Sequence, residues 1–311
     1  MIVAYNTVNK ECNESQYNHQ HCITRHRAGE FFIFSCFHND IKLILQIYYN
    51  KVTFVKFFKR FFFKSSQWLI LAINTGYIVA NKKYAHIFFD LDNTLWDFEA
   101  NSIETFRDLF IKYDLENRGI VSFDKFIQVY HKHNSLLWEF YRQGKIVKEV
   151  LNIRRFSMAL DEFGIGDHLL SSNMAGDYVE QSPTKTQLFP DAFAILDYLS
   201  SKYRLHIITN GFEEVQFRKL SYSGLRKYFS GIITSEEAGT KKPDPAIFNY
   251  ALSFCKADVN ESVMIGDDEE IDVLGAFNVG MDSILVDYAG KNNQSKATHR
   301  INSLQELYDI L

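Results

Sequence analysis

The chain has 311 residues, of which 46% are hydrophobic and 23% are charged, and its formal net charge is −4. This composition is ordinary for a globular protein and offers no general basic surface for a nucleic acid polymer, so local charge must bind any phosphate-bearing ligand. Four cysteines in a chain of this length do not make a disulfide framework, which favours a reducing, cytoplasmic setting.

Residues 1–81 differ from the rest of the chain. They are crowded with Phe, Tyr, Ile, Asn and Lys and keep neither helical nor strand periodicity for long. The apolar run at 68–80 is shorter than the roughly 18–20 residues that span a bilayer, and polar residues interrupt it, so we expect no stable membrane insertion. We expect an atypical N-terminal extension outside the fold, and one hypothesis is that it is read through from a misplaced start.

The first orderly feature is the stretch HIFFDLDNTLWDF at 86–98, an apolar run that ends in Asp90 and Asp92. Such a run is typical of a parallel strand buried on both faces, and open α/β sheets place their ligands at the carboxyl ends of such strands. Residues i and i+2 of an extended segment share a face, so the two carboxylates point into one crevice. Alone, an Asp-x-Asp pair is more often a polar corner than a site.

The rest of the chain divides into two patterns. Between about 100 and 180, apolar residues recur at three- and four-residue spacing, which predicts a group of amphipathic helices. After Pro183 helices alternate with apolar strands, which predicts a parallel sheet with right-handed crossovers. We therefore expect an α/β core built from 82–97 and 188–311, divided by a helical insert at 98–187.

Two further strand ends carry groups suited to a phosphate. Thr209, Asn210 and Gly211 end the strand IITNG and offer a hydroxyl and main-chain N–H groups near the start of a helix. Lys242 lies in the loop TKKPDP after the strand GIITS, where a fixed cation could neutralise charge that develops on a transferred group. Taken singly, these residues could equally form a turn and a solvated lysine.

The strand VMIGDD ends in a fourth polar cluster, formed by Asp267 and Asp268 with Asp272 a turn later. Such a cluster suits a hard cation such as Mg²⁺, although a helix N-cap is the simpler reading of Asp268. Four strand ends that supply carboxylates, a hydroxyl and a lysine in this order favour one active site over four separate polar corners.

Together these residues resemble the four motifs of the haloacid dehalogenase (HAD) superfamily. The resemblance covers about 84–311 and rests on Asp90-x-Asp92-x-Thr94, Thr209, Lys242 before a proline, and Gly266-Asp267 followed by Asp272. It implies a Rossmann-like core, a helical cap of the C1 type at 98–187, and phosphoryl transfer through an aspartyl-phosphate.

The resemblance also implies a role for each matched residue. Asp90 is the nucleophile, Asp92 the general acid and base, Thr209 and Asn210 hold phosphoryl oxygens, and Lys242 stabilises Asp90 and the transferring group. Thr94 and Gly211 are placed in substrate binding. The implied Mg²⁺ is held by the Asp90 carboxylate, the Asp92 carbonyl and Asp267, with Asp268 or Asp272 around it.

Within the superfamily, stretches such as LWEFYRQGKI (137–146) and SEEAGTKKPDPAIF (235–248) are most similar to the pyrimidine 5′-nucleotidases. This similarity implies a small phosphorylated metabolite, a pyrimidine nucleoside monophosphate, as the partner. The candidates for substrate contact are Trp138, Tyr141, Arg142 and Arg154 in the insert, with Trp96 and Phe98 beside the first motif. Aromatic rings could stack on a base, but packing inside the insert is the stronger alternative for Trp138 and Tyr141.

Other functions stay open at this point. A phosphatase of sugar phosphates would use the same motifs, and so would a sugar-phosphate mutase. A 2-haloacid dehalogenase needs neither a metal nor an acid at the second position of the first motif, so Asp92 and Asp267 speak against it. A non-catalytic binding protein on the same fold is the remaining alternative, because a fold alone does not fix function.

Overall fold

The computed structural model describes residues 20–25, 31–37, 40–44, 84–290 and 294–311, and the chain forms two compact units, Met1–Ala80 and Asn81–Leu311. In the first unit, β1 (Gln20–Arg25), β2 (Phe31–Phe37) and β3 (Asp40–Ile44) form an antiparallel sheet. The sequence did not predict these strands, because their apolar residues do not alternate for long. The apolar run at 68–80 lies outside the described residues, and the proposed exclusion of 1–81 from the fold stays a prediction.

The second unit contains a six-stranded parallel sheet with the order β6-β5-β4-β7-β8-β9. Its strands are β4 (His86–Phe89), β5 (Arg204–Thr209), β6 (Phe229–Thr234), β7 (Ser262–Gly266), β8 (Asp282–Val286) and β9 (His299–Ile301). The chain builds the sheet outward from β4 in both directions, so the strand order reverses at β4. The predicted Rossmann-like α/β fold is confirmed, and the switch point at which such folds bind ligands falls beside Asp90.

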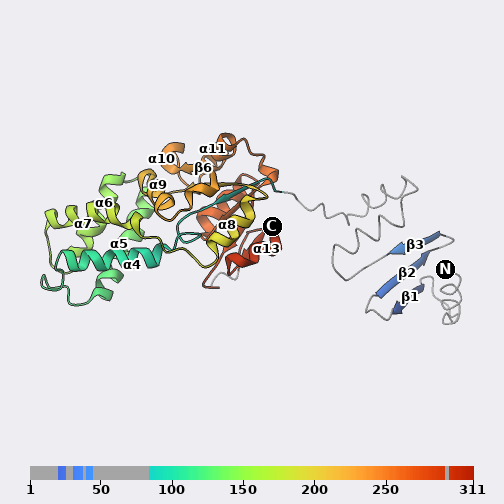
Figure 1. Cartoon of the computed structure of the whole chain (residues 1–311), viewed down its shortest axis with the longest axis horizontal. Helices are drawn as coiled ribbons and strands as arrows, with labels where there is room; N and C mark the ends of the chain where they lie inside the picture. Colours follow the sequence, from blue (N-terminus) through green and yellow to red (C-terminus); the bar gives the residue numbers. More distant parts are fainter. Residues whose placement is uncertain (1–19, 26–30, 38–39, 45–83, 291–293) are drawn as a thin grey trace. The chain divides into compact units, whose positions relative to one another are not determined.

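Helices cover both faces of this sheet, and a group of helices stands beside it (Figure 1). The group consists of α4 (Phe98–Lys112), α5 (Phe123–Arg142), α6 (Lys148–Asp161) and α7 (His168–Gln181), with the short η1 (Ser182–Thr184) after it. Around the sheet lie α8 (Ala192–Ser200), α9 (Glu213–Tyr222), η2 (Arg226–Tyr228), α10 (Ser235–Ala238), α11 (Pro245–Cys255), η3 (Val259–Glu261), the π-helical turn η4 (Glu269–Val273), α12 (Leu274–Asn278), η5 (Leu304–Glu306) and α13 (Leu307–Ile310). No helix in the described part of the chain has the length and apolar character that crossing a membrane requires.

Alternating side chains anchor the sheet to its two helical layers. On β4, Ile87 and Phe89 enter one apolar core while Phe88 enters the other, and all three are fully buried. The same alternation along β7 sends Val263 to the first core and Met264 to the second. Because both faces are covered, the strands read as continuous apolar runs. The first polar side chains therefore come where the strands end.

Candidate active site

The first pair of carboxylates lies where the central strand ends. Asp90 directly follows β4, and its main-chain N–H donates to the carbonyl oxygen of Ile265 on β7 at 2.9 Å. In the tight turn after Asp92, Asn93 has a left-handed φ of +60°, which Asn tolerates better than most residues, and its N–H donates to the carbonyl of Trp96 at 2.9 Å. The turn leaves both carboxylates on the wall of one cavity.

The second strand end fixes the loop that carries the lysine. The Asn210 side chain accepts a hydrogen bond from the main-chain N–H of Lys242 at 2.8 Å and donates to its carbonyl at 2.9 Å. Thr209 lies on the cavity wall, and its hydroxyl accepts from the Gly211 N–H at 3.1 Å. A Cβ at Gly211 would meet the Gln216 amide nitrogen at 1.6 Å, so a larger residue here would displace the Gln216 side chain.

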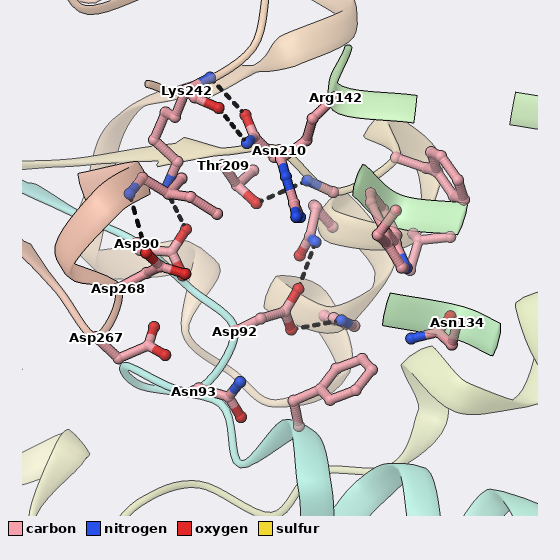
Figure 2. Close-up of a pocket in the computed structure, with 18 of the residues that line it drawn as sticks. Asp90, Asp92, Asn93, Asn134, Arg142, Thr209, Asn210, Lys242, Asp267 and Asp268 are labelled. Carbon is pink, nitrogen blue, oxygen red and sulfur yellow. Dashed lines mark hydrogen bonds and ion pairs between the residues drawn. The ribbon is translucent and has the colours of Figure 1, made fainter. Parts of the chain in front are cut away.

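Lys242 is the cation at the centre of the site. Its ammonium donates to Asp90 Oδ1 at 2.5 Å (Figure 2). It also donates to Asp272 Oδ1 at 2.6 Å, and the side chain is 2% exposed. Although burial lowers it, the carboxylates of Asp272 and Asp90 hold the pKa of Lys242 above its ordinary value. The lysine therefore stays charged and fixes one oxygen of Asp90.

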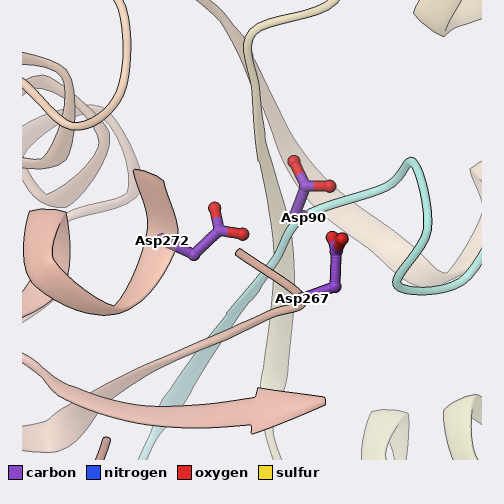
Figure 3. A group of neighbouring side chains, drawn as sticks. All are labelled: Asp90, Asp267 and Asp272. Carbon is purple, nitrogen blue, oxygen red and sulfur yellow. The ribbon is translucent and has the colours of Figure 1, made fainter. Parts of the chain in front are cut away.

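Three carboxylates crowd around this single cation. One oxygen from each of Asp90, Asp267 and Asp272 lies within 4.8 Å of the others (Figure 3). Burial raises the pKa of Asp90 to about 7 despite Lys242, and burial together with the charge of Asp90 raises the pKa of Asp267 to about 8. Three carboxylates and one ammonium leave two negative charges in excess when all are ionised. Oxygen ligands with excess negative charge suit a hard divalent cation, so these residues fit Mg²⁺.

Two other predicted site residues, Thr94 and Asp268, lie next to this carboxylate cluster and have structural roles. Thr94 is fully buried and donates its hydroxyl to Asp267 Oδ1 at 3.1 Å, so it orients a carboxylate and does not line the cavity. Asp268 lines the cavity, but its Oδ1 accepts from the main-chain N–H groups of Glu270 and Ile271, both at 2.9 Å. Asp268 is therefore the N-cap of η4, which agrees with the simpler interpretation of this residue in the sequence.

Asp92 has its own partners, which the sequence did not predict. Lys219 on α9 donates to Asp92 Oδ1 at 2.5 Å, and Gln216 one turn earlier donates to Oδ2 at 2.8 Å. The Lys219 ammonium also lies 4.0 Å from the centre of the Trp96 ring, and the lysine is 2% exposed. Asp92 thus lies in a small ionic pocket separate from the Lys242 cluster.

Both ionic groups face one cavity of about 430 Å³, a size typical of small-molecule sites. Of the residues predicted for the site, those that line it are Asp90, Asp92, Phe98, Thr209, Asn210, Gly211, Lys242, Asp267, Asp268, Asp272, Trp138 and Arg142. The cavity lies between the carboxyl ends of the strands and the helical group, to which Trp138 and Arg142 on α5 belong.

The aromatic candidates of α5 take different positions. Trp138 lines the cavity and stacks on Phe212 at 5.3 Å between ring centres, whereas Tyr141 is buried edge-on against both rings and does not line the cavity. Packing is therefore the role of Tyr141. Arg142 reaches the cavity wall while it pairs with Glu139 at 2.5 Å, one turn earlier on the helix.

The remaining candidates separate in the same way. Trp96 is fully buried in the sheet core, while Phe98 lines the cavity. Arg154 is exposed and lies away from the cavity, and the next residue, Arg155, is buried and lines it. Spacing alone could not separate two adjacent arginines without the exact rotation of α6.

Comparisons with known proteins agree with this geometry. Residues 87–286 match the family of haloacid dehalogenase-like hydrolases. The chain is 31% identical to the pyrimidine 5′-nucleotidase YjjG of Escherichia coli, over 74% of this chain and 98% of that protein. It is 30% identical to the pyrimidine 5′-nucleotidase PynA of Streptococcus pneumoniae, over 73% of this chain and 95% of that protein. The crystal structure of the HAD-hydrolase YfnB from Bacillus subtilis bound to magnesium is similar with a TM-score of 0.66 and 29% identity, over 74% and 99% of the two chains.

Proposed function

The chain belongs to the haloacid dehalogenase-like hydrolases, and on that premise we propose that it is a Mg²⁺-dependent phosphatase of pyrimidine nucleoside 5′-monophosphates. The observation that carries the proposal is the position of Asp90, whose carboxylate is held by Lys242 at 2.5 Å on the wall of a cavity large enough for a small metabolite. A buried carboxylate oriented by a cation is an arrangement suited to attack on phosphorus.

In the proposed reaction, a carboxylate oxygen of Asp90 attacks phosphorus and the bond from phosphorus to the leaving oxygen breaks. The carboxyl group of Asp92 gives its proton to that oxygen. Asp92 then takes a proton from a water molecule, which attacks the phosphorus, and the bond to Asp90 breaks to release inorganic phosphate. Lys242 and the Thr209 hydroxyl neutralise and hold the phosphoryl oxygens in both steps.

The proposed cation fits the crowded carboxylates. Asp90, Asp267 and the Asp92 carbonyl would hold it, with Asp272 and Asp268 beside them. When bound, Mg²⁺ would neutralise the excess negative charge and polarise a phosphoryl oxygen. The raised pKa of Asp90 and of Asp267 supports this assignment, because burial and the neighbouring carboxylates oppose their ionisation and a bound cation would offset that cost.

The substrate class rests on the relatives and on the far wall of the cavity. Two relatives of about 30% identity are named pyrimidine 5′-nucleotidases. The stacked rings of Trp138 and Phe212 lie on the cavity wall, where an aromatic base could pack against them. We assign residues 98–187 as the cap that closes over the leaving group and residues 82–97 with 188–311 as the catalytic core.

A phosphate-release screen tests this proposal. It would compare nucleoside monophosphates with sugar phosphates, with and without Mg²⁺. We expect turnover of UMP, dUMP and dTMP that depends on Mg²⁺. Strong turnover of sugar phosphates with none of these nucleotides would overturn the substrate class and leave the phosphatase assignment standing. No phosphate release from either class would overturn both.

Lys219 offers a test of how Asp92 is held. We expect Lys219→Met to lower kcat by about 10- to 100-fold with KM within about threefold, because a misoriented general acid slows chemistry more than binding. Lys219→Arg keeps the charge beside Asp92 and should recover part of the loss. Lys227 is an exposed lysine on η2, so Lys227→Met is the matched control and should leave kcat unchanged. Steady-state kinetics on one nucleotide decides between these outcomes.

A further inference from the structure

Arg155 on α6 is a buried cation without a counter-ion. Among the described residues, the buried Lys and Arg side chains are Lys219, Lys242 and Arg155. Both lysines form ion pairs with aspartates, as described above. Arg155 is 4% exposed and has no carboxylate within ion-pair distance. An unpaired charge held away from water is strongly unfavourable, so this side chain lacks a partner that would compensate it.

Its protein contacts satisfy only part of the guanidinium. Nη1 lies 3.4 Å from the Asn134 side-chain oxygen and Nη2 lies 3.0 Å from that of Asn152. The Nε–H has no hydrogen-bond partner. The guanidinium carbon lies 4.9 Å from the centre of the Tyr178 ring, which fixes the side chain in place. Arginine has five N–H donors in a rigid fork, so it retains capacity for an acceptor oxygen.

This guanidinium belongs to the same cavity as the nucleophile. Arg155, Asn134 and Tyr178 all line it, and they come from α6, α5 and α7 of the helical group. Figure 2 shows Asn134 on the opposite side of the cavity from Asp90 and Lys242. A substrate whose phosphate lies at Asp90 therefore extends its other end toward the wall that contains Arg155.

We propose that Arg155, held by Asn134 and Tyr178, is the specificity-determining residue that binds an acceptor oxygen at the end of the substrate remote from the phosphate. The inference rests on the proposed function, and for a pyrimidine nucleotide the acceptor is a ring carbonyl oxygen. A second phosphate on a sugar offers the same chemistry. In either case the substrate supplies the partner that the protein lacks, and the guanidinium fork selects against leaving groups without such an oxygen.

The test compares Arg155→Met with Arg154→Met, its exposed neighbour on the same helix. Phenyl phosphate, whose ring has no acceptor oxygen, is the reference substrate for UMP. We expect Arg155→Met to lower kcat/KM for UMP by about 10- to 100-fold, mostly through KM, with phenyl phosphate within about twofold. Arg154→Met should change neither value. An equal loss on both substrates together with a lower melting temperature would assign Arg155 to folding and overturn the proposal.

A milder variant keeps the test decisive if Arg155→Met does not fold. Arg155→Lys retains the charge without the guanidinium fork. Uridine, which has no phosphate, should inhibit hydrolysis of phenyl phosphate by the wild type but not by this variant. Equal inhibition of both proteins would contradict the inference. A ribose bisphosphate in place of UMP distinguishes the source of the acceptor oxygen. The substrate whose kcat/KM falls more when Arg155 is replaced is the one that supplies this oxygen.

The proposed function can fail without this inference. If the wild type hydrolyses phenyl phosphate but not UMP, the assignment to pyrimidine nucleotides is wrong. The Arg155 variants are then assayed with the best substrate from the phosphate-release screen. The inference itself fails if Arg155→Met keeps the wild-type preference for that substrate over phenyl phosphate.

Discussion

Replacing Asp90 with Asn should lower phosphatase activity by on the order of 10⁴-fold or more, because an amide cannot attack phosphorus and no second nucleophile is positioned to replace it. Among the described residues, Asp267 and Asp272 each have a carboxylate oxygen within 4.8 Å of one from Asp90. Asp272 is 1% exposed and already bonded to Lys242 at 2.6 Å. Steady-state phosphate release, with protein purified away from host phosphatases, measures the loss.

The same variant should fold at least as well as the wild type without Mg²⁺. The folded protein raises the pKa of Asp90 from 3.8 to about 7, so the folded state binds a proton more tightly than the unfolded state. Stability that this group contributes is present below its unfolded pKa and is lost as the pH rises toward 7 and above. Asn carries no charge and avoids that loss, so unfolding at pH 8 separates a catalytic defect from a folding defect.

Asp92→Asn is the counterpart that reveals the intermediate. Phenyl phosphate is the substrate for this test, because its phenolate leaves with little help from an acid. Without a base to activate water, the phosphoryl group transferred from it to Asp90 should persist, and mass spectrometry of the acid-quenched protein should find it on the peptide that contains Asp90. The double variant with Asp90→Asn should carry none. More than about 1% residual activity in Asp90→Asn, or phosphorylation at another residue, would refute the role of Asp90 as nucleophile.

The sheet could be predicted from the sequence because burial on both faces gives its strands an unmistakable pattern. The runs of β4, β5 and β7 contain apolar residues on both faces and end abruptly in polar ones. The three residues of β9 are too few to show any period, and their pairing with β8 depends on the register of the sheet. β1 to β3 were missed for a related reason, since short runs that keep no period for long favour no single element.

The candidate site could be predicted where its residues follow strands, and much less where they lie on helices. Each strand end has a fixed position in the sheet, so Asp90, Thr209 and Asp267 could be expected to meet. Lys219 and Arg155 face the cavity only through the rotation of α9 and α6, and one residue along a helix turns a side chain by about 100°. A signal for Lys219 existed in its spacing of three from Gln216, which places both side chains on one helix face.

The site contains two separate ionic groups, each built around one lysine. Lys242 forms ion pairs with Asp90 and Asp272, while Lys219 forms one with Asp92. Asp92 therefore has an ion-pair partner of its own, although its charge still raises the pKa of Asp90. The cluster around Lys242 has two negative charges in excess once all three carboxylates are ionised, and that excess determines how the protein should respond to a divalent cation.

Mg²⁺ should stabilise the protein, and more strongly at pH 8 than at pH 6. Folding raises the pKa of Asp90 to about 7 and of Asp267 to about 8, so at pH 6 protons occupy the oxygens that the cation needs. Without Mg²⁺, this part of the stability falls as the pH rises from about 4 through 8. Mg²⁺ binds the ionised carboxylates and reverses the loss. Each pH unit below the pKa of a ligand carboxyl reduces its ionised fraction by about tenfold, so the apparent affinity for Mg²⁺ should be tenfold or more weaker at pH 6 than at pH 8.

Thermal unfolding with graded Mg²⁺ at the two pH values measures this linkage. A cation at about 100 times its Kd stabilises by about 2.7 kcal/mol, which corresponds to an increase in Tm of roughly 5–10 °C for a unit of this size. Asp267→Asn should abolish most of the increase and most of the activity. Glu270→Gln removes one negative charge from an exposed side chain near the cluster and should preserve both. An equal increase in Tm at pH 6 and pH 8 would place the cation away from these carboxylates, because only ligands that must lose protons make its binding depend on pH in this range. An equal increase in Asp267→Asn and in the wild type would lead to the same conclusion.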